Sequence, residues 1–113
     1  MNPAVTVKEN YEFRRIYRKG RSAVSSCLVV YYRKNRLGHN RLGVTVSTKL
    51  GHAVVRNRVR RRLREIYRLN REKMPAGYDI IIVARVRAAE APYRKLERHY
   101  LRCLGELGLL TDA

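Results

Sequence analysis

Residues 53 to 73 carry the pattern that most constrains the fold of this 113-residue chain. Its apolar side chains have the i, i+4, i+8, i+11 spacing of one side of an α-helix. They are Val55, Val59, Leu63 and Ile66. Most other residues of the segment are basic, and Pro75 and Gly77 follow it as helix-ending residues. One long helix therefore has to serve the core on one side and be a polycation on the others.

The arginines of this predicted helix are concentrated at its start. Six of the ten residues from Arg56 to Glu65 are arginine, opposed only by Glu65 and, further on, Glu72. Like charges repel, so a folded protein gathers them where a polyanion binds. Guanidinium groups also bond phosphate bidentately and stack on bases. The block therefore favours a nucleic-acid partner over a solvated helix face.

The charge of the whole chain agrees with this local pattern. Twenty-six Lys and Arg against nine Asp and Glu give a net charge of +17, with a pI of about 10.9. Hydrophobic residues make up 45% of the chain, enough for a core, which excludes a disordered basic tail. This length predicts one domain, residues 1–113. No export signal or membrane-length apolar stretch is visible, so we expect a cytoplasmic protein without a membrane partner.

The N-terminal segment predicts a first helix. Thr6 and Glu9 have the spacing of a capping box, which places a helix at residues 7–18 with Gly20 just past its end. Its apolar stripe consists of Phe13, Ile16 and Tyr17.

Three later segments have the character of strands. Residues 27–33 are mostly β-branched or aromatic, residues 42–46 alternate apolar and small side chains, and residues 35–40 between them are typical of a turn. These features predict an antiparallel hairpin. Residues 78–85 form a near-continuous apolar run, which predicts a strand buried on both faces.

Pro92 suits the first turn of a last helix. Its inner stripe is expected to contain Leu96, Tyr100, Cys103 or Leu104, and Leu107. The elements together predict an α+β single-domain sandwich, with helices packed on a small mixed sheet of about four strands in the order α-β-β-β-α-β-α.

The sequence offers little for metal binding or hydrolysis by the protein itself. Cys27 and Cys103 lack zinc-ligand spacing and imply no disulfide, so we expect reduced core cysteines. The acidic residues are few and scattered, and His39, His52 and His99 fall in three unrelated elements. We therefore expect no catalytic residue and no metal site in the protein.

Residues 41 to 65 closely resemble the signature of the bacterial ribonuclease P protein subunit. The strand end with Ser47 and Lys49 and the Arg-Asn-Arg block at positions 56 to 58 carry this resemblance, which extends to residues 13–20 and 78–85. Two positions depart from the family pattern: Thr48 stands where a cation is usual, and His52 where asparagine is usual. Neither departure removes a hallmark arginine.

The resemblance implies a small protein that binds ribonuclease P RNA and helps it to remove the 5′ leader of precursor tRNA. In that family the RNA carries the chemistry with Mg²⁺ ions held chiefly by phosphates, and no protein partner is required. The protein extends contact with the substrate along the leader. The implied fold is ribosomal-protein S5 domain 2-like.

The basic helix and the strand end before it are the places where RNA contacts are expected. Residues expected to bind the catalytic RNA are Arg56, Asn57, Arg58, Arg60, Arg61 and Arg64. Asn57 suits a hydrogen bond to the local backbone or a base edge, and Arg62 lies outside the family's strongest positions. Ser47 and Lys49 could hold leader phosphates or could merely cap the strand.

Phe13 and Tyr17 are one helical turn apart, and their spacing alone favours core residues. The family uses aromatic residues at these positions, with a third at the position of Tyr31, to line a cleft for the single-stranded leader. Stacking on bases tolerates many leader sequences. Tyr31 and Tyr32 point to opposite sides of their strand, so only one can face that cleft.

Two other classes of function share the same charge and fold class. A ribosomal-type structural RNA-binding protein would bind RNA without acting on a leader. An autonomous basic nuclease or a DNA-binding protein is the third option. The RNA that copurifies with the protein would discriminate these classes.

Overall fold

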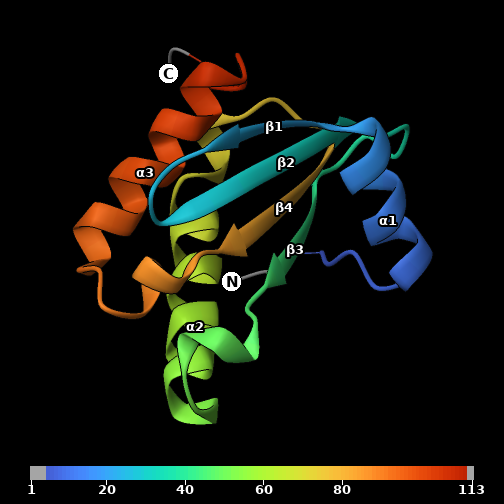
Figure 1. The fold of residues 1–113 in the computed structure, drawn as a ribbon. Coiled ribbons are helices and arrows are strands. Elements are labelled where there is room, and N and C mark those ends of the chain that lie inside the picture. Colours follow the sequence, from blue (N-terminus) through green and yellow to red (C-terminus); the bar gives the residue numbers. More distant parts are fainter. Residues whose placement is uncertain (1–4, 112–113) are drawn as a thin grey trace.

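The computed structural model describes residues 5–111, which form a four-stranded mixed sheet with three α-helices packed on it (Figure 1). The helices and strands are α1 (Asn10–Lys19), β1 (Arg21–Val24), β2 (Leu28–Lys34), β3 (Arg41–Thr45), α2 (Ala53–Leu69), β4 (Tyr78–Ala84) and α3 (Tyr93–Glu106). Short 3-10 helices occupy Thr48–Leu50, Arg71–Lys73 and Val86–Ala89. The predicted α+β class and element order are confirmed.

The strand order is β1-β2-β4-β3, with β4 antiparallel to β2 and parallel to β3. The predicted hairpin of residues 27–33 with 42–46 is therefore wrong, because β4 lies between those strands. Ile80–Ile82 of β4 are fully buried, and a strand that is apolar on both faces stabilises the sheet best from an interior position. The tight hairpin instead joins β1 to β2. In its turn, the buried Ser25 Oγ accepts hydrogen bonds from the amides of Cys27 and Leu28.

α1 begins at Asn10, three residues later than the capping-box spacing of Thr6 predicts. The amide of Val7 instead donates to the carbonyl oxygen of Leu42 at 2.9 Å, so this segment runs beside β3. The capping box is formed by Glu9 and Glu12. Pairing with the sheet edge satisfies the backbone before the helix starts and fixes where α1 enters.

Gly20 ends α1 as expected, although its φ of −81° is ordinary for any residue. What requires glycine here is a close approach. A Cβ at this position would lie 2.5 Å from the carbonyl oxygens of both Ile16 and Tyr32. The end of α1 is thereby held directly against the backbone of β2.

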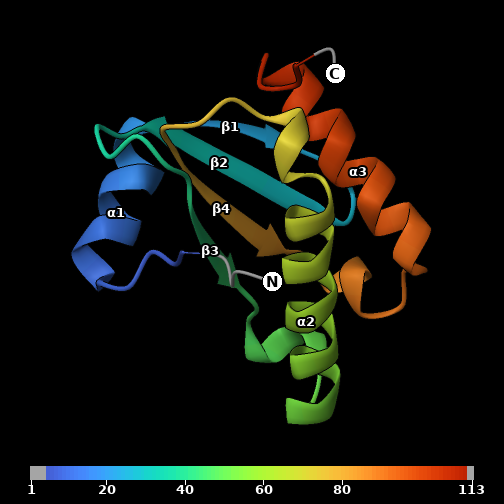
Figure 2. The same ribbon diagram turned by 180° about the vertical axis from the view of Figure 1, so that it is seen from behind.

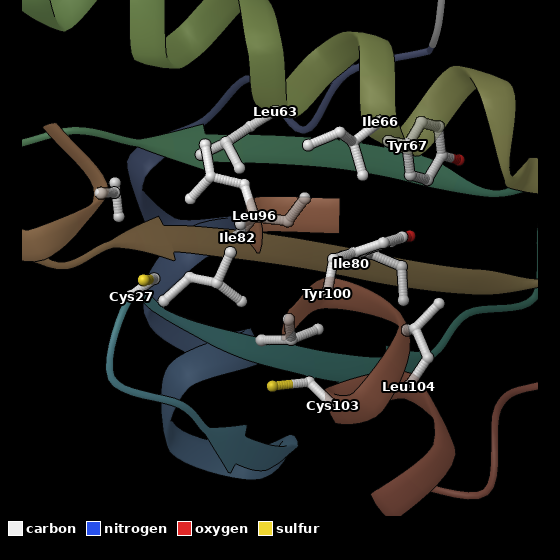
Figure 3. Packing of buried hydrophobic residues seen from close by; sticks show 14 of the residues in the cluster. Cys27, Leu63, Ile66, Tyr67, Ile80, Ile82, Leu96, Tyr100, Cys103 and Leu104 are labelled. Atoms are coloured by element: carbon white, nitrogen blue, oxygen red, sulfur yellow. The ribbon is translucent and has the colours of Figure 1, made fainter. Parts of the chain in front are cut away.

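One face of the sheet is closed by α2 and α3, and the other is partly covered by α1 (Figures 1 and 2). Figure 3 shows Ile80 and Ile82 of β4 packed among side chains of both helices of the closed face. The buried side chains of α2 are Val59, Leu63, Ile66 and Tyr67, and those of α3 are Leu96, Tyr100, Cys103 and Leu104. The predicted inner stripes are confirmed at these positions, but Val55 at the start of α2 is only half-buried, and the buried Leu107 lies just past the end of α3.

α2 ends at Leu69, earlier than the predicted limit of residue 73. The next residue, Asn70, is buried, and its Nδ2 donates to the carbonyl oxygen of Ile66 at 2.8 Å and to Glu97 Oε2 at 2.9 Å. An asparagine side chain that bonds the last turn competes with further helical hydrogen bonds. The backbone tightens into a 3-10 turn before Pro75.

Both cysteines are free and fully buried, as expected of core residues, and burial raises the pKa of the Cys103 thiol. His99 is half-buried on α3, where burial lowers its pKa, and its Nδ1 has no hydrogen-bond partner among residues 5–111. Among the helices of residues 5–111, none has the length and apolarity needed to cross a membrane.

Candidate RNA-binding surfaces

The arginines of α2 lie on both flanks and on the outer side of the helix, around its buried stripe. At about 100° per residue, one flank carries a row one turn apart, and the opposite flank carries a second row. The first row is Arg56, Arg60 and Arg64; the second is Arg58 and Arg62; Asn57 and Arg61 occupy the outer side. The structure thus brings all six predicted contact residues onto one helix, spread over more than half of its circumference.

The second row is engaged by the protein itself. Arg58 Nη2 donates to the carbonyl oxygen of Ala89 at 3.1 Å, and Arg62 Nη1 donates to that of Ala91 at 3.5 Å. Both acceptors lie in the connection between β4 and α3. Arg58 and Arg62 therefore both tie α2 to the segment that leads into α3, and Arg62 is more than ordinary surface.

The other arginines have few protein partners. Arg60 Nη1 donates to Asn57 Oδ1 at 3.0 Å, and Arg61 and Arg64 are exposed. The Nε atoms of Arg56 and Arg58 are buried and have no hydrogen-bond partner among the described residues. A buried N–H without an acceptor is unfavourable, so an acceptor that reached either Nε atom would stabilise that side chain. This end of α2 carries guanidinium groups, which are chemically suited to bond phosphate.

Three aromatic side chains gather where α1 crosses the opposite face of the sheet. The rings of Phe13 and Tyr17 have centroids 6.3 Å apart, and Tyr17 meets Tyr31 edge-on at 4.8 Å. Tyr17 is 37% exposed, and the hydroxyls of Tyr17 and Thr45 share a hydrogen bond of 3.0 Å. Tyr32 lies on the closed face against Tyr78, as the strand alternation predicts. Spacing alone favoured a buried role for Phe13 and Tyr17, but both keep accessible surface.

Beside these rings, a row of small side chains crosses all four strands in register. Its members are Val24, Val29, Val83 and Thr45, each half-buried or exposed. Together with Phe13, Tyr17 and Tyr31 they form a surface that we call the aromatic face. It offers ring edges and an apolar floor on a rigid sheet, which suits bases better than phosphates.

Phe13 owes its place to Gly43 on β3. A Cβ on Gly43 would lie 2.7 Å from Cε1 of the Phe13 ring, so the ring occupies the space that a side chain would need. Ile16 packs beside it on Ile81. The distance between α1 and the sheet is therefore set by the absence of one side chain.

Ser47 and Lys49 are exposed in the loop that joins β3 to α2. Ser47 Oγ accepts a hydrogen bond from the Lys49 amide at 3.2 Å and caps the 3-10 turn, which is the structural role foreseen for a polar strand end. The Lys49 ammonium remains at the surface. Thr48 and His52, the two departures from the family pattern, are exposed in the same loop.

Sequence reasoning missed an ion-pair network that ties α1 to the sheet. Arg41 Nη1 donates to Glu12 Oε2 at 2.6 Å, and its Nη2 and Nε donate to the two oxygens of Asp79 at 2.8 and 2.9 Å. Asn35 Nδ2 adds a bond of 2.8 Å to Asp79. The one available signal was a carboxylate at the start of a strand predicted to be buried on both faces.

The charges of this network stabilise one another. The hydrogen bond from Arg41 lowers the pKa of Glu12. Burial alone would raise the pKa of Asp79, but hydrogen bonds from Arg41 and Asn35 outweigh it, and the pKa is lowered. Hydrogen bonding to Asp79 in turn raises the pKa of Arg41. All three groups therefore stay ionised at neutral pH.

Metal donors are not gathered anywhere in the described part of the chain. Within residues 5–111 no three His, Cys, Asp or Glu side chains lie together as a metal-binding group. The carboxylates of Glu12 and Asp79 are both occupied by Arg41. These side chains do not fit a resident Mg²⁺ ion, and no step of a cleavage reaction is assigned to a metal bound by the protein.

The fold and these surfaces define a small α+β protein with a polycationic helix on one side of its sheet and exposed aromatic rings on the other. The sequence profile of the family described as Ribonuclease P matches residues 1–108. This chain belongs to the ribonuclease P protein family. As a member, it is the protein component of the ribonucleoprotein endoribonuclease that processes the 5′ end of tRNA, with ribonuclease P RNA as its partner.

Individual relatives agree along almost the whole chain. The ribonuclease P protein component of Natranaerobius thermophilus is 46% identical over 110 residues, which cover 97% of this chain and 96% of that protein. The structure of the Staphylococcus aureus RNase P protein has a TM-score of 0.87 at 35% identity, covering 96% and 99% of the two chains. A mutant of that protein with defective mRNA degradation activity has a TM-score of 0.85, covering 93% and 89% at 35% identity. No relative named here favours the ribosomal-type alternative.

Proposed function

We propose that the two surfaces divide the work between two RNAs. The arginine face of α2 docks the ribonuclease P RNA through its phosphates, and the aromatic face holds the single-stranded 5′ leader of precursor tRNA. The observation that carries the proposal is the exposure of Tyr17 beside Phe13 and Tyr31 on the face of the sheet that α2 does not cover. One protein can then bind its catalytic RNA and the leader at the same time.

The leader is held in this proposal by stacking and by charge. Base stacking on aromatic rings is worth about 1 to 3 kcal/mol per base and tolerates any sequence, as an enzyme with many tRNA substrates requires. Lys49 and the free hydroxyl proton of Ser47 lie in the loop between the aromatic face and α2 and are suited to leader phosphates. Arg56, Arg60, Arg61 and Arg64 serve the catalytic RNA, and Arg58 does so while supporting α3.

Cleavage belongs to the RNA in this scheme, with Mg²⁺ held by RNA phosphates. The protein contributes position: it fixes the leader relative to the catalytic RNA. Its place of action is the cytoplasm, where buried thiols such as Cys27 and Cys103 remain reduced.

Two single variants, each expected to weaken the binding of one RNA and not the other, test whether the two surfaces bind different RNAs. Holoenzyme is reconstituted with Tyr17→Ala or Arg61→Ala protein, and its affinities for mature tRNA and for precursor tRNA with a leader of about 4 nucleotides are measured. Affinity of each protein for the catalytic RNA is measured separately. Tyr17→Ala should weaken precursor binding about five- to a hundredfold and leave mature tRNA and catalytic RNA unchanged. Arg61→Ala should weaken catalytic-RNA binding and flatten its log–log salt slope by up to about one unit.

Two matched variants complete that experiment. Tyr93→Ala removes a tyrosine from α3, and Arg102→Ala removes an exposed arginine from the same helix. Neither should reproduce the selective losses. If Tyr17→Ala harmed mature and precursor tRNA equally and lowered the melting temperature strongly, the ring would be packing and the leader site would lie elsewhere.

The absence of a nuclease site in the protein needs its own measurement. Protein freed of RNA should leave precursor tRNA intact, whereas catalytic RNA and Mg²⁺ should restore a single cut at the mature 5′ end. An unrelated mRNA is included because of the mRNA degradation activity named for the Staphylococcus aureus protein. Site-specific cleavage of precursor tRNA by rigorously RNA-free protein would defeat the assignment of chemistry to the RNA.

A further inference from the structure

α1 lies across the sheet and separates two different surfaces. Glu12 bonds Arg41 on β3, Ile16 packs on β4, and Gly20 touches the backbone of β2. The helix therefore crosses β3, β4 and β2 in turn. The aromatic face lies on one side of α1. The other side has different chemistry.

On that other side is a pocket between α1 and the loop after β2. The register places Arg33, Asp79 and Arg41 in one row across its floor. Four basic residues line this pocket in addition to Arg41: Arg15, Arg33, Lys34 and Arg36. We call these four residues the basic pocket.

The acids of the pocket offset these cations only in part. Glu12 and Asp79 are the two carboxylates in its lining, and both are bound by Arg41 at 2.6 and 2.8 Å. None of the four basic-pocket residues forms an ion pair with a carboxylate among residues 5–111. Arg41 offsets only one of these two carboxylates, so the five basic and two acidic residues of the lining leave a net charge of +3, which favours a polyanion at this position.

The basic charge continues from the pocket onto the outer side of α1. Arg15 lines both the pocket and a second hollow whose other basic residues are Arg14, Arg18 and Lys19. The Arg15 guanidinium lies 5.9 Å from the centre of the Tyr11 ring, which holds it over the helix surface. A phosphate chain could follow this surface without a break.

We propose that the basic pocket and the outer side of α1 form a track for the phosphate backbone of leader nucleotides that extend beyond the aromatic face. The inference rests on the proposed function and deepens it. Continuity supports it: Arg33 is two residues from Tyr31 on the same face of β2, and Arg14 lies one turn before Tyr17 on α1. The catalytic RNA is a poorer occupant, because α2 lies on the opposite face of the sheet.

The proposal predicts that leader length matters. Holoenzyme is assembled with wild-type protein or with the double variant Arg15→Ala/Arg33→Ala, and affinity is measured for mature tRNA and for leaders of about 4 and about 12 nucleotides. Wild type should bind the longer leader more tightly than the shorter. The double variant should lose about threefold for each phosphate contact, or about tenfold in all, for the longer leader alone. Its salt slope for that substrate should fall by about 1.4.

Two controls distinguish the effect of the track on leader binding from the effects of net charge and of the aromatic face. Arg98→Ala/Arg102→Ala removes the same charge from the exposed side of α3 and should leave the length effect intact. The gap between mature tRNA and the short leader tests the aromatic face, and the gap between short and long leaders tests the track. Unchanged binding of the long leader would overturn the track. Equal losses for all three tRNAs, or a loss of catalytic-RNA affinity, would assign these arginines to another RNA and overturn it as well.

Discussion

The two faces of the sheet are made by the same four strands and are held in different ways. The closed face packs large apolar side chains of α2 and α3 against β4, with Leu63, Tyr100 and Leu104 at no measurable exposure. The half-open face has a small buried group of Val7, Ile16 and Ile81. There α1 is fixed by an ion-pair network and a glycine rather than by extensive apolar burial.

This difference separates stability from recognition. Free energy from apolar burial is concentrated on one face, so the other face can leave aromatic and β-branched side chains uncovered. Rings that face water are available to bases. The contacts that position them are few and specific, so single substitutions should act on the two faces very differently.

The largest effect is expected on the closed face. Leu63→Ala should lower the free energy of unfolding by about 2 to 5 kcal/mol, because it leaves a cavity in the main core. Urea unfolding measures this loss. The fraction of protein that remains folded should still distinguish precursor from mature tRNA, and a selective loss of that distinction would show that the faces are not independent.

Arg41→Met should be the most damaging change on the half-open face. It leaves Asp79, only 7% exposed, without its ion-pair partner, and breaking such a pair costs about 3 kcal/mol or more. Leader binding should fall with stability because α1 loses its tie through Glu12. The double variant Arg41→Met/Asp79→Asn should recover part of the stability. No recovery would mean that the unpaired carboxylate is not the cause.

Gly43→Ala should have a smaller effect than either of these changes. The added Cβ meets the Phe13 ring at 2.7 Å, and overpacking of this kind costs about 1 to 3 kcal/mol. The ring and α1 must move, so we expect weaker leader binding with unchanged catalytic-RNA binding. Gly105→Ala on α3 is the matched control: its Cβ would meet only Leu110 at 3.5 Å, and alanine should stabilise a helix by about 0.5 to 1 kcal/mol.

The smallest expected effect is a loss of folding stability at low pH. The pKa values of Glu12 and Asp79 are lowered in the folded state, so their contribution to stability is present above their unfolded values of about 4. It is lost as pH falls through the lowered folded values. Wild type should therefore lose stability below about pH 4 more steeply than Asp79→Asn, as measured by urea unfolding at each pH. Parallel curves would show that the network contributes no acid sensitivity.

Much of the fold could be predicted because its signals are local. The helical spacing of Val59, Leu63 and Ile66 and the buried run at β4 are properties of adjacent residues. The pairing of strands is not local. Residues 27–33 and 42–46 are neighbours along the chain, but the more apolar β4 takes the place between them. The prediction that α1 begins at residue 7 was wrong for a related reason, since Thr6 and Val7 pair with β3.

The candidate sites divide in the same way. The arginines of α2 follow directly from one helix, and resemblance to the family placed Phe13, Tyr17 and Tyr31 together, which the structure shows to be neighbours. Arg41 was missed because its partners come from a helix and a strand far along the chain. No spacing rule connects such residues before the strand order is known.

The central position of β4 has a consequence for the order of assembly. This strand follows α2 in the chain, yet it joins β2 to β3 and forms the floor under α1. A growing polypeptide therefore exposes its arginine-rich helix before the sheet can close. The proposed leader surface, which includes Val83 of β4, is therefore completed only after the proposed RNA-docking helix has been synthesised.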